Sequence, residues 1–287
     1  MIPPAFEYHA PRTIGDALHL LSTLGEDAKL LAGGHSLLPM MKLRFAQPSA
    51  LIDINRIPEL RGISEQAGVV RIGAMTSENE LIASALLRQR IPLLPEAAAL
   101  IADPQVRNRG TIGGDIAHGD PGNDHPALMM ALDATFVLQG PGGERQVKAV
   151  DFFHGTYMTE LAENELLTAI LITPPAPGTG YAYQKLKRKV GDWATAGAAV
   201  LLRLQGDTVT YAAIGLTNVA PTALRARAAE AALLGQTLTA ATLEAVGQLV
   251  RAQCDPAEDL RGDIEYKTAM AGEMTQRAIR AAAARCN

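Results

Sequence analysis

The chain has 287 residues, of which 48% are hydrophobic and 20% are charged, as is usual for a soluble protein of one to three packed domains. Its formal net charge is −4 and it has no long basic stripe, so we expect no nucleic acid binding. The two cysteines, Cys254 and Cys286, fit a reducing compartment and are too few to hold a four-cysteine iron–sulfur cluster. Because neither a signal peptide nor a membrane-spanning apolar run is present in the sequence, we expect a cytoplasmic protein.

The first 57 residues predict a small α/β lobe with a parallel sheet, because strand-like and helical segments alternate. Thr13 suits the N-cap of the first helix and Gly25 its end, while Pro39 must lie in the first turn of the second helix. The expected elements are a strand at 6–11, a helix at 13–25, a strand at 28–34, a short helix at 36–44 and a strand at 50–54.

Residues 58–177 predict a second, larger lobe built on a mixed sheet. Its helical part should be broken into two pieces near Pro92. The segment PPAPGTG, residues 174–180, has three prolines and two glycines and is the best candidate for a linker. The expected elements are a strand at 68–77, helices within 78–101, a helix and a strand within 127–140, and strands at 145–153 and 165–173.

Residues 178–287 predict a C-terminal domain of a three-stranded antiparallel sheet followed by helices. Its strands lie within 180–188 and 197–216, and the dipeptide Gly206–Asp207 is a good hairpin turn. From about Pro221 the chain is rich in alanine and helical in pattern. The protein is therefore expected to be of the α+β class, with two lobes followed by this domain.

Two glycine segments are suited to an anion. AGGHS, residues 32–36, lies between a strand and a helix, where glycines permit close approach and N–H groups are free. TIGGD, residues 111–115, shows the same chemistry, and two such loops facing each other across a cleft would hold a diphosphate. Read alone, each loop is more simply a turn. Neither matches a Rossmann or a Walker A motif.

A metal site is the alternative for the same region. His118, Asp120, Asp124 and His125 are possible ligands within eight residues, but their spacing matches no zinc pattern. Asp124 more simply caps the helix that follows, or accepts from a hydroxyl of a ligand. The basic run KLKRK, residues 185–189, is equally compatible with a solvated edge and with contact to an anion.

The segments AGGHSLLPMMKLR, IADPQVRNRGTIGGDIAHGDPGNDHPALMM, YAYQKLKRKVGDWATAGAAV and AAIGLTNVA together resemble one family. This is the xanthine dehydrogenase family of molybdenum hydroxylases, and within it the FAD-binding medium subunits of the carbon monoxide dehydrogenase branch. The resemblance covers nearly the whole chain. It implies one FAD between the N-terminal and middle lobes, with the first glycine loop around the diphosphate and the second opposite to it.

The resemblance also implies contact residues, which are carried over position by position. Ile101 and Ala102 would border the flavin, and Asp124 would bind a polar part of the cofactor. The expected cofactor-binding residues are Ala32, Gly33, Gly34, His35, Ser36, Leu37, Ile101, Ala102, Thr111, Gly113, Gly114, Asp115, Asp124, Leu167, Lys185 and Trp193.

Two positions depart from the family pattern. Asp115 stands where the family usually has Asn, and a carboxylate accepts hydrogen bonds but donates none unless it is protonated. It either turns to a ribityl hydroxyl, has a raised pKa, or weakens FAD binding. Trp193 stands where near relatives have Tyr, and we expect its larger face beside the isoalloxazine ring rather than in the core.

The role implied by the resemblance is electron transfer within a larger enzyme. A small partner subunit with [2Fe–2S] clusters would deliver electrons that originate at a molybdenum cofactor on a large subunit, and a quinone would accept them. A dimer of heterotrimers, associated with the inner face of the membrane, is expected, with carbon monoxide as the substrate. The alternatives are the same role in a hydroxylase of an N-heterocycle or aldehyde, a metal-dependent hydrolase, or a scaffold without flavin. No catalytic residue is expected on this chain, because the cofactor supplies the chemistry.

Overall fold

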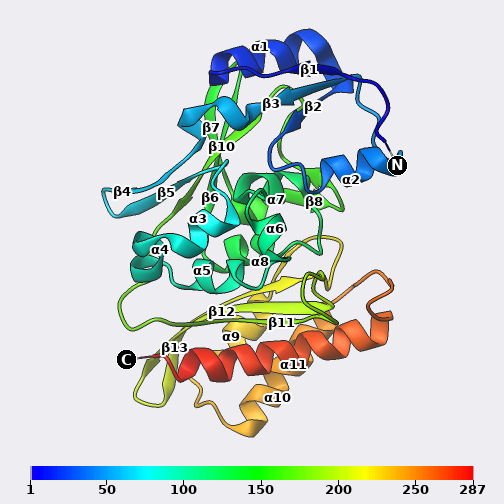
Figure 1. Cartoon of the computed structure of the whole chain (residues 1–287). Coiled ribbons are helices and arrows are strands. Elements are labelled where there is room, and N and C mark those ends of the chain that lie inside the picture. The colour runs from blue at the N-terminus through cyan, green and yellow to red at the C-terminus, as the bar shows by residue number, and fades with distance from the viewer. Residues whose placement is uncertain (1, 287) are drawn as a thin grey trace.

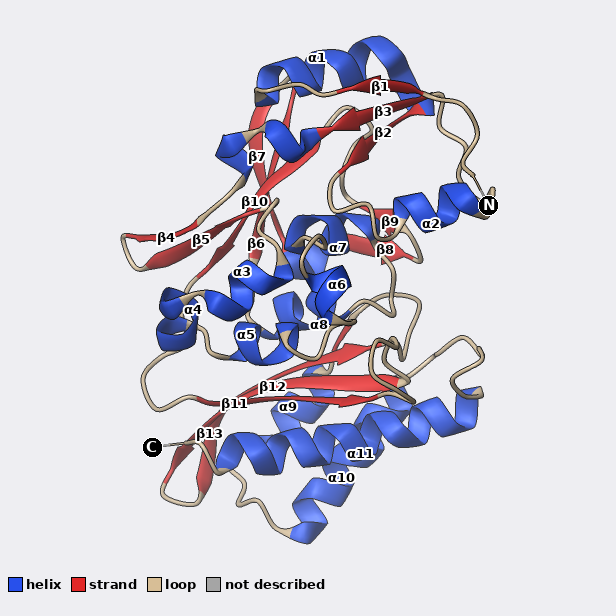
Figure 2. Cartoon of the chain, viewed as in Figure 1, coloured by secondary structure: helices blue, strands red, loops and turns tan. Residues whose placement is uncertain are grey.

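The computed structural model describes residues 2–286 and contains three larger sheets in consecutive parts of the chain, besides a two-stranded one (Figure 1). Figure 2 shows helices on the outer sides of the first and last sheets and a group of short helices between them. The α+β class is therefore confirmed. A helix able to cross a bilayer is absent from residues 2–286, because none there combines the necessary length with enough apolar side chains.

The N-terminal sheet has the order β1-β3-β2 and both of its strand pairs are parallel, as the alternating pattern predicted. Thr13 caps the first helix, its Oγ1 accepting from the N–H of Asp16 at 3.1 Å. Pro39 lies in the first turn of α2, as expected. The elements are β1 (Glu7–His9), α1 (Ile14–Leu24), β2 (Ala28–Leu31), α2 (Leu37–Lys42) and β3 (Ala50–Asp53), with 3₁₀ turns at Gly25–Asp27, Ile54–Arg56 and Pro58–Leu60.

The middle sheet has five strands in the order β4-β5-β10-β6-β7, and each of its pairs is antiparallel. The expected mixed sheet was therefore wrong in this detail, because hairpins rather than crossing helices join β4 to β5 and β6 to β7. The strands are β4 (Ile63–Gln66), β5 (Val69–Gly73), β6 (Thr135–Gly140), β7 (Gly143–Lys148) and β10 (Leu166–Ile172), and a small separate hairpin is formed by β8 (Phe153–Gly155) and β9 (Met158–Thr159).

Six short helices accompany the middle sheet within the described residues. The expected break near Pro92 is present, but a second break occurs at Ser84, which takes an extended conformation and caps the next helix by accepting from the N–H of Leu87. The helices are α3 (Glu78–Ala83), α4 (Ala85–Arg90), α5 (Leu93–Ala98), α6 (Pro104–Arg107), α7 (Ile112–His118) and α8 (Asp124–Ala131).

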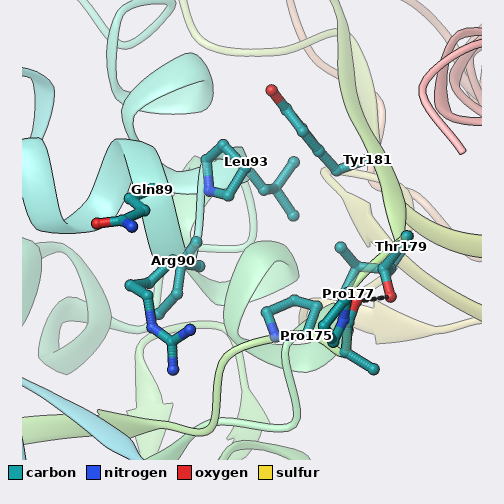
Figure 3. Close-up of a pocket in the computed structure, with 12 residues that line it drawn as sticks. Gln89, Arg90, Leu93, Pro175, Pro177, Thr179 and Tyr181 are labelled. Carbon is teal, nitrogen blue, oxygen red and sulfur yellow. Dashed lines mark hydrogen bonds between the residues drawn. The ribbon is translucent and has the colours of Figure 1, made fainter. Parts of the chain in front are cut away.

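Residues 173–179 form no helix or strand and lead to the C-terminal domain. A cavity of about 160 Å³ lies between this linker and residues 89–93 (Figure 3). The domain has the predicted antiparallel strands and one short additional strand, in the order β11-β12-β13-β14. Its elements are β11 (Gly180–Leu186), β12 (Ala196–Gln205), β13 (Thr208–Thr217), β14 (Leu224–Arg225), α9 (Arg227–Leu233), α10 (Ala240–Gln253) and α11 (Ile264–Ala283).

The C-terminal sheet is buried on both faces. Along β12, Ala199 and Leu201 belong to the core of the middle lobe, whereas Ala198, Val200 and Leu202 face the helices of the C-terminal domain. This explains why β12 reads as a continuous apolar run instead of an alternating one. The two parts of the chain thus share a packed interface on which polar side chains can be held rigidly.

Candidate cofactor site

The loop between β2 and α2 offers a run of free backbone donors. Gly34 has a φ of 77°, which glycine adopts at little cost. The side-chain amide of Asn55 donates to the carbonyl of Ala32 at 2.8 Å and fixes the start of the loop. Within residues 2–286 we find no acceptor for the N–H groups of residues 33–37. A run of consecutive free N–H groups is suited to bind an anion.

The second glycine pair lies in the first turn of α7, and its backbone donors are already used. The N–H groups of Ile112 and Gly113 donate to the carbonyls of Thr76 and Ala74, at 3.0 and 2.9 Å. That of Gly114 donates to the hydroxyl of Thr111 at 3.2 Å. The expectation that both glycine segments present the same free N–H groups is therefore wrong. The first N–H groups of α7 already donate to the residues that follow β5 and to Thr111.

The two glycine segments nevertheless lie in contact with each other. A Cβ added to Gly33 would lie 2.3 Å from the carbonyl oxygen of Arg109, and one added to Gly114 would lie 3.5 Å from the Cβ of Ala32. Gly33 is thus needed for contact between the two lobes. The first loop therefore lies against the start of α7 and the residues that precede it.

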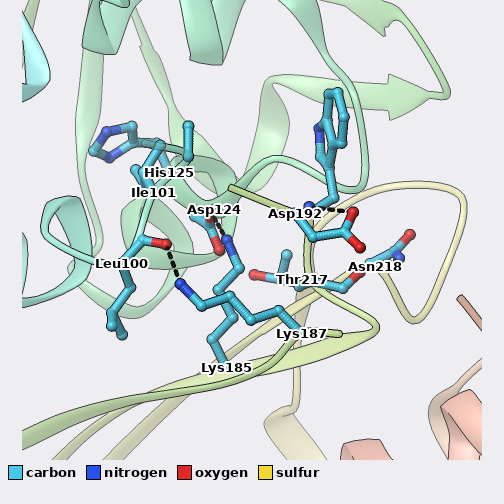
Figure 4. Close-up of polar contacts among 12 residues, drawn as sticks. Leu100, Ile101, Asp124, His125, Lys185, Lys187, Asp192, Thr217 and Asn218 are labelled. Carbon is cyan, nitrogen blue, oxygen red and sulfur yellow. Dashed lines mark hydrogen bonds and ion pairs between the residues drawn. The ribbon is translucent and has the colours of Figure 1, made fainter. Parts of the chain in front are cut away.

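Asp124 faces the C-terminal domain. Helix α8 begins at Asp124 with Asn123 as its N-cap, so the expectation that Asp124 caps this helix was wrong. Its carboxylate accepts from the ammonium of Lys185 at 2.7 Å (Figure 4). It also accepts from the hydroxyl of Tyr183. Both charged side chains are almost completely buried. The pair therefore joins the middle lobe to β11 at the edge of the candidate site.

Asp115 lies one helical turn beyond the N-cap of α7. Its carboxylate accepts from the N–H of His125 at 3.3 Å, and its carbonyl accepts from the side chain of Asn123. Burial raises the pKa of Asp115 to about 7; the charge of His125 opposes this rise, whereas Glu78 and Asp124 add to it. The raised pKa was one of the three possibilities left open by the sequence, and it makes the protonated carboxyl, which is a donor, accessible near neutral pH.

Ile101 and Ala102 lie in a turn after α5 that two cations hold in place. Arg107 donates to the carbonyls of both residues, at 2.7 and 3.3 Å. Lys187 donates to the carbonyl of Leu100 at 3.0 Å (Figure 4). Ala102 has a φ of 43°, which is uncommon for a residue other than glycine. The turn is therefore fixed from two elements.

Trp193 and Leu167 differ in accessibility. Trp193 is about half exposed, with the guanidinium of Arg261 over its ring at 5.2 Å, and a Cβ at Gly122 would lie 3.3 Å from its Cδ1. It thus lies between the C-terminal domain and the segment after α7, where its free face is available to a ligand. Leu167 is buried in the core of the middle lobe, so only its backbone is available for contact.

The four residues of the metal hypothesis do not converge. The ring of His118 packs at a tilt against Tyr157, Asp120 accepts from the N–H of Gly122, and Asp124 and His125 pair with Lys185 and Glu78. Nowhere in residues 2–286 are three or more His, Cys, Asp or Glu side chains grouped as ligands for a metal ion. Their arrangement does not favour a metal-dependent hydrolase.

Several residues around the site were not singled out from the sequence. Tyr183 is one of them: it lies two residues before the expected Lys185 along β11, so the two side chains share a face, and this period of two was a usable signal. Lys187 and Arg107 donate to backbone carbonyls of the turn at residues 100–102, and no sequence pattern predicts such contacts. Glu78 is the first residue of α3 and reads as an ordinary acidic residue of a helix start, although it is buried.

Comparison with known proteins agrees with this geometry. Residues 4–175 match the family model "FAD binding domain in molybdopterin dehydrogenase", and residues 181–282 match "CO dehydrogenase flavoprotein C-terminal domain". The chain therefore belongs to the FAD-binding flavoprotein subunits of the molybdenum hydroxylases, which are oxidoreductases.

Within this family the chain is similar to the medium chain of carbon monoxide dehydrogenase. It is 65% identical to that of Hydrogenophaga pseudoflava, over all of both chains, and 52% identical to that of Afipia carboxidovorans, over 99% of each. A solved structure of the Hydrogenophaga enzyme superposes with a TM-score of 0.99 over both whole chains at 67% identity. Quinoline 2-oxidoreductase from Pseudomonas putida is also similar, with a TM-score of 0.94 at 35% identity over 99% of each chain.

Proposed function

We propose that the chain holds one FAD between its N-terminal and middle lobes. The observation that carries the proposal is the set of free N–H groups at residues 33–37, which lies against the N-terminal turn of α7. A run of uncommitted donors suits a diphosphate, and the family model that matches this part of the chain is one of FAD binding. The proposed contacts are Ala32, Gly33, Gly34, His35, Ser36, Leu37, Ile101, Ala102, Thr111, Gly113, Gly114, Asp115, Asp124, Leu167, Lys185 and Trp193.

The residues present fit this cofactor with one exception. The first loop supplies donors, the turn at residues 100–102 is rigid, and Trp193 offers an exposed aromatic face. Asp115 is the exception, since an ionised carboxylate would repel a diphosphate. In its protonated form it donates a hydrogen bond instead, and its pKa of about 7 supports this role in the lower part of the physiological pH range.

The bound flavin supplies the redox chemistry, and this chain supplies position and electrostatics. We propose that the complex contains a small subunit with [2Fe–2S] clusters and a large subunit with a molybdenum cofactor, assembled as a dimer of heterotrimers in the cytoplasm. Electrons pass from the clusters to the flavin and then to a quinone. No side chain of this subunit has to act as an acid, base or nucleophile.

Carbon monoxide is the proposed substrate of the whole complex. The identity of 65% over full length to the medium chain of a carbon monoxide dehydrogenase supports it. Relatives from hydroxylases of other substrates, such as nicotine 6-hydroxylase, are 36% identical. Because the substrate pocket lies on another subunit, a hydroxylase of an N-heterocycle or an aldehyde is the alternative.

The test is to purify the chain with its two partner subunits and to measure its flavin and metal content. The loss of visible absorbance on exposure to carbon monoxide then reports reduction of the flavin. We expect one FAD per chain, bleached by carbon monoxide. A complex that contains FAD and is bleached only by an N-heterocycle or an aldehyde would favour the alternative substrates. A stable complex without flavin would show that the chain is a scaffold.

A further inference from the structure

Glu78 and His125 form a buried pair that the proposed cofactor contacts do not use. The Nε2 atom of His125 lies 3.0 and 2.9 Å from the two carboxylate oxygens of Glu78, and the side chains are 0% and 3% exposed. The other ring nitrogen, Nδ1, is buried and has no partner among the described residues. Because an unpaired buried polar atom costs stability, packing alone does not explain a histidine here.

The backbones of the same two residues hold the two ends of one segment. The N–H of Glu78 donates to the carbonyl of Gly110 at 3.1 Å, and the N–H of His125 donates to the carboxylate of Asp115 at 3.3 Å. Glu78 is the first residue of α3 and His125 is the second residue of α8. Their side-chain pair therefore closes a clasp around residues 110–115, which include the glycine turn that contacts the first loop.

We propose that Glu78 and His125 are positioning residues for the flavin cofactor, and that their ion pair keeps residues 110–115 against the loop at residues 32–36. The inference rests on the proposed FAD site and deepens it. The charge of the pair matters as well as its shape. Two neutral side chains of similar size would fill the same space, but the hydrogen bond between them would be weaker.

The charged groups around the pair indicate when it is intact. Asp115 faces it from α7 and Asp124 from α8, while Lys185 and Tyr183 of β11 are bonded to Asp124. Burial by itself lowers the pKa of His125, but Glu78, and after it Asp115 and Asp124, raise this pKa to about 9. The stabilisation is therefore fully present below pH 6.5 and is lost as the pH rises through about 9.

The experiment uses the complex with its partner subunits, stripped of flavin and titrated with FAD. The variants are Glu78→Gln, His125→Gln and the double variant. The control is His154→Gln, because His154 and Glu160 form an exposed pair of similar length, 2.8 Å. We expect each single variant to bind FAD about tenfold more weakly at pH 7.5, the loss of one charged hydrogen bond, and the control to bind normally.

The pH profile separates positioning by charge from simple support of the fold. In an Asp115→Asn background the titration of Asp115 is removed, so a remaining fall in FAD affinity as the pH rises towards 9 reports His125, whose pKa is then lower because the charge of Asp115 no longer raises it. We expect FAD affinity to fall with rising pH in the Asp115→Asn variant. The fall should be absent when Glu78→Gln and His125→Gln are added to it, even if the added pair of substitutions leaves the melting temperature unchanged.

Wild-type FAD affinity in both single variants would overturn the inference, as would a double variant with unchanged affinity and an unchanged fall above pH 8. Should a single variant not fold, the comparison of Asp115→Asn with and without the double substitution decides. Failure of the unmodified complex to bind FAD would overturn the proposed function itself, and this inference with it.

Discussion

Single glycines at the contact between the lobes differ in what a side chain would meet. At Gly33 and Gly113 an added Cβ collides with backbone, whereas at Gly114 it meets the hydroxyl of Thr111 at 2.8 Å and the methyl group of Ala32 at 3.5 Å. Gly114 is therefore the position at which cofactor binding can be disturbed while the lobes stay together.

We expect Gly114→Ala to fold and to bind FAD about tenfold more weakly, because relief of the Thr111 contact shifts the turn at a cost of about 1–3 kcal/mol. Flavin content after gel filtration is the measurement. Gly142→Ala, at a position with nothing within 4 Å of the new Cβ, is the control. Equal flavin content in the two variants would contradict a cofactor role for this turn.

Asp115→Asn should bind FAD more tightly than the parent at pH 8 and about equally at pH 6. The pKa of about 7 means that the parent is mostly ionised at the higher pH and mostly protonated at the lower. Screened repulsion of about 1–2 kcal/mol predicts a gain of roughly tenfold at pH 8. Isothermal titration at both pH values measures it, and a loss of affinity in the variant would mean that the carboxylate itself holds a hydroxyl of the cofactor.

At the scale of elements, β11 carries the polar link between the middle lobe and the C-terminal domain. The basic run that begins at Lys185 is no solvated edge at its start, since Lys185 is bonded to Asp124 and Lys187 to the turn at residues 100–102. The side chains of Lys185 and Asp124 are almost completely buried, and removal of either partner of such a pair leaves a buried charge without compensation.

Lys185→Met should therefore destabilise the chain by about 3 kcal/mol, near the lower end for a broken buried pair, because Tyr183 still donates to Asp124. Urea unfolding at pH 7 checks this. Lys189→Met, in the same run but exposed, should change stability little, and Asp124→Asn together with Lys185→Met should recover most of the loss. If Lys185→Met and Lys189→Met changed the free energy of unfolding by similar amounts, the pair of Lys185 with Asp124 would contribute nothing to stability.

Local signals predicted most elements but not how α7 uses its donors. The N-terminal lobe followed from its alternating pattern, its helix cap and its proline because those preferences act within a few residues. The role of Glu78 depends on His125, a partner far along the chain, whereas Ser84 caps the next helix through the nearby N–H of Leu87. The two glycine segments look alike in sequence, yet the N–H groups of the first have no acceptor in the described part of the chain, whereas those of the second donate to the segment that follows β5 and to Thr111.

At the scale of the whole molecule, the three parts are joined by shared cores. Met75 and Leu166 of the middle lobe pack in the N-terminal core, and β12 serves the cores on both of its faces. The lobes around the glycine loops are therefore in contact within the single chain. Trp193 is less firmly held, since about half of its surface is exposed.

We expect the isolated chain to bind FAD more weakly than the complex with both partners. The diphosphate end of the site is formed by the chain itself, so the gain on assembly should arise at Trp193, where partner subunits select one arrangement of the loop. A site formed only part of the time loses affinity by that fraction. Titration of FAD onto the chain alone and onto the complex measures the gain; equal affinities would show that the site is complete without partners.

The two glycine segments should also differ in heavy water. Amide protons of residues 33–37 have no acceptor within the described residues and should exchange from the folded chain without any opening, whereas those of residues 112–114 exchange only when the first turn of α7 leaves its partners. Binding of FAD should then slow hydrogen exchange strongly at residues 33–37 and hardly at all at residues 112–114. Mass spectrometry of peptides that contain each segment thus reports occupancy of the diphosphate cradle even in preparations that have no activity.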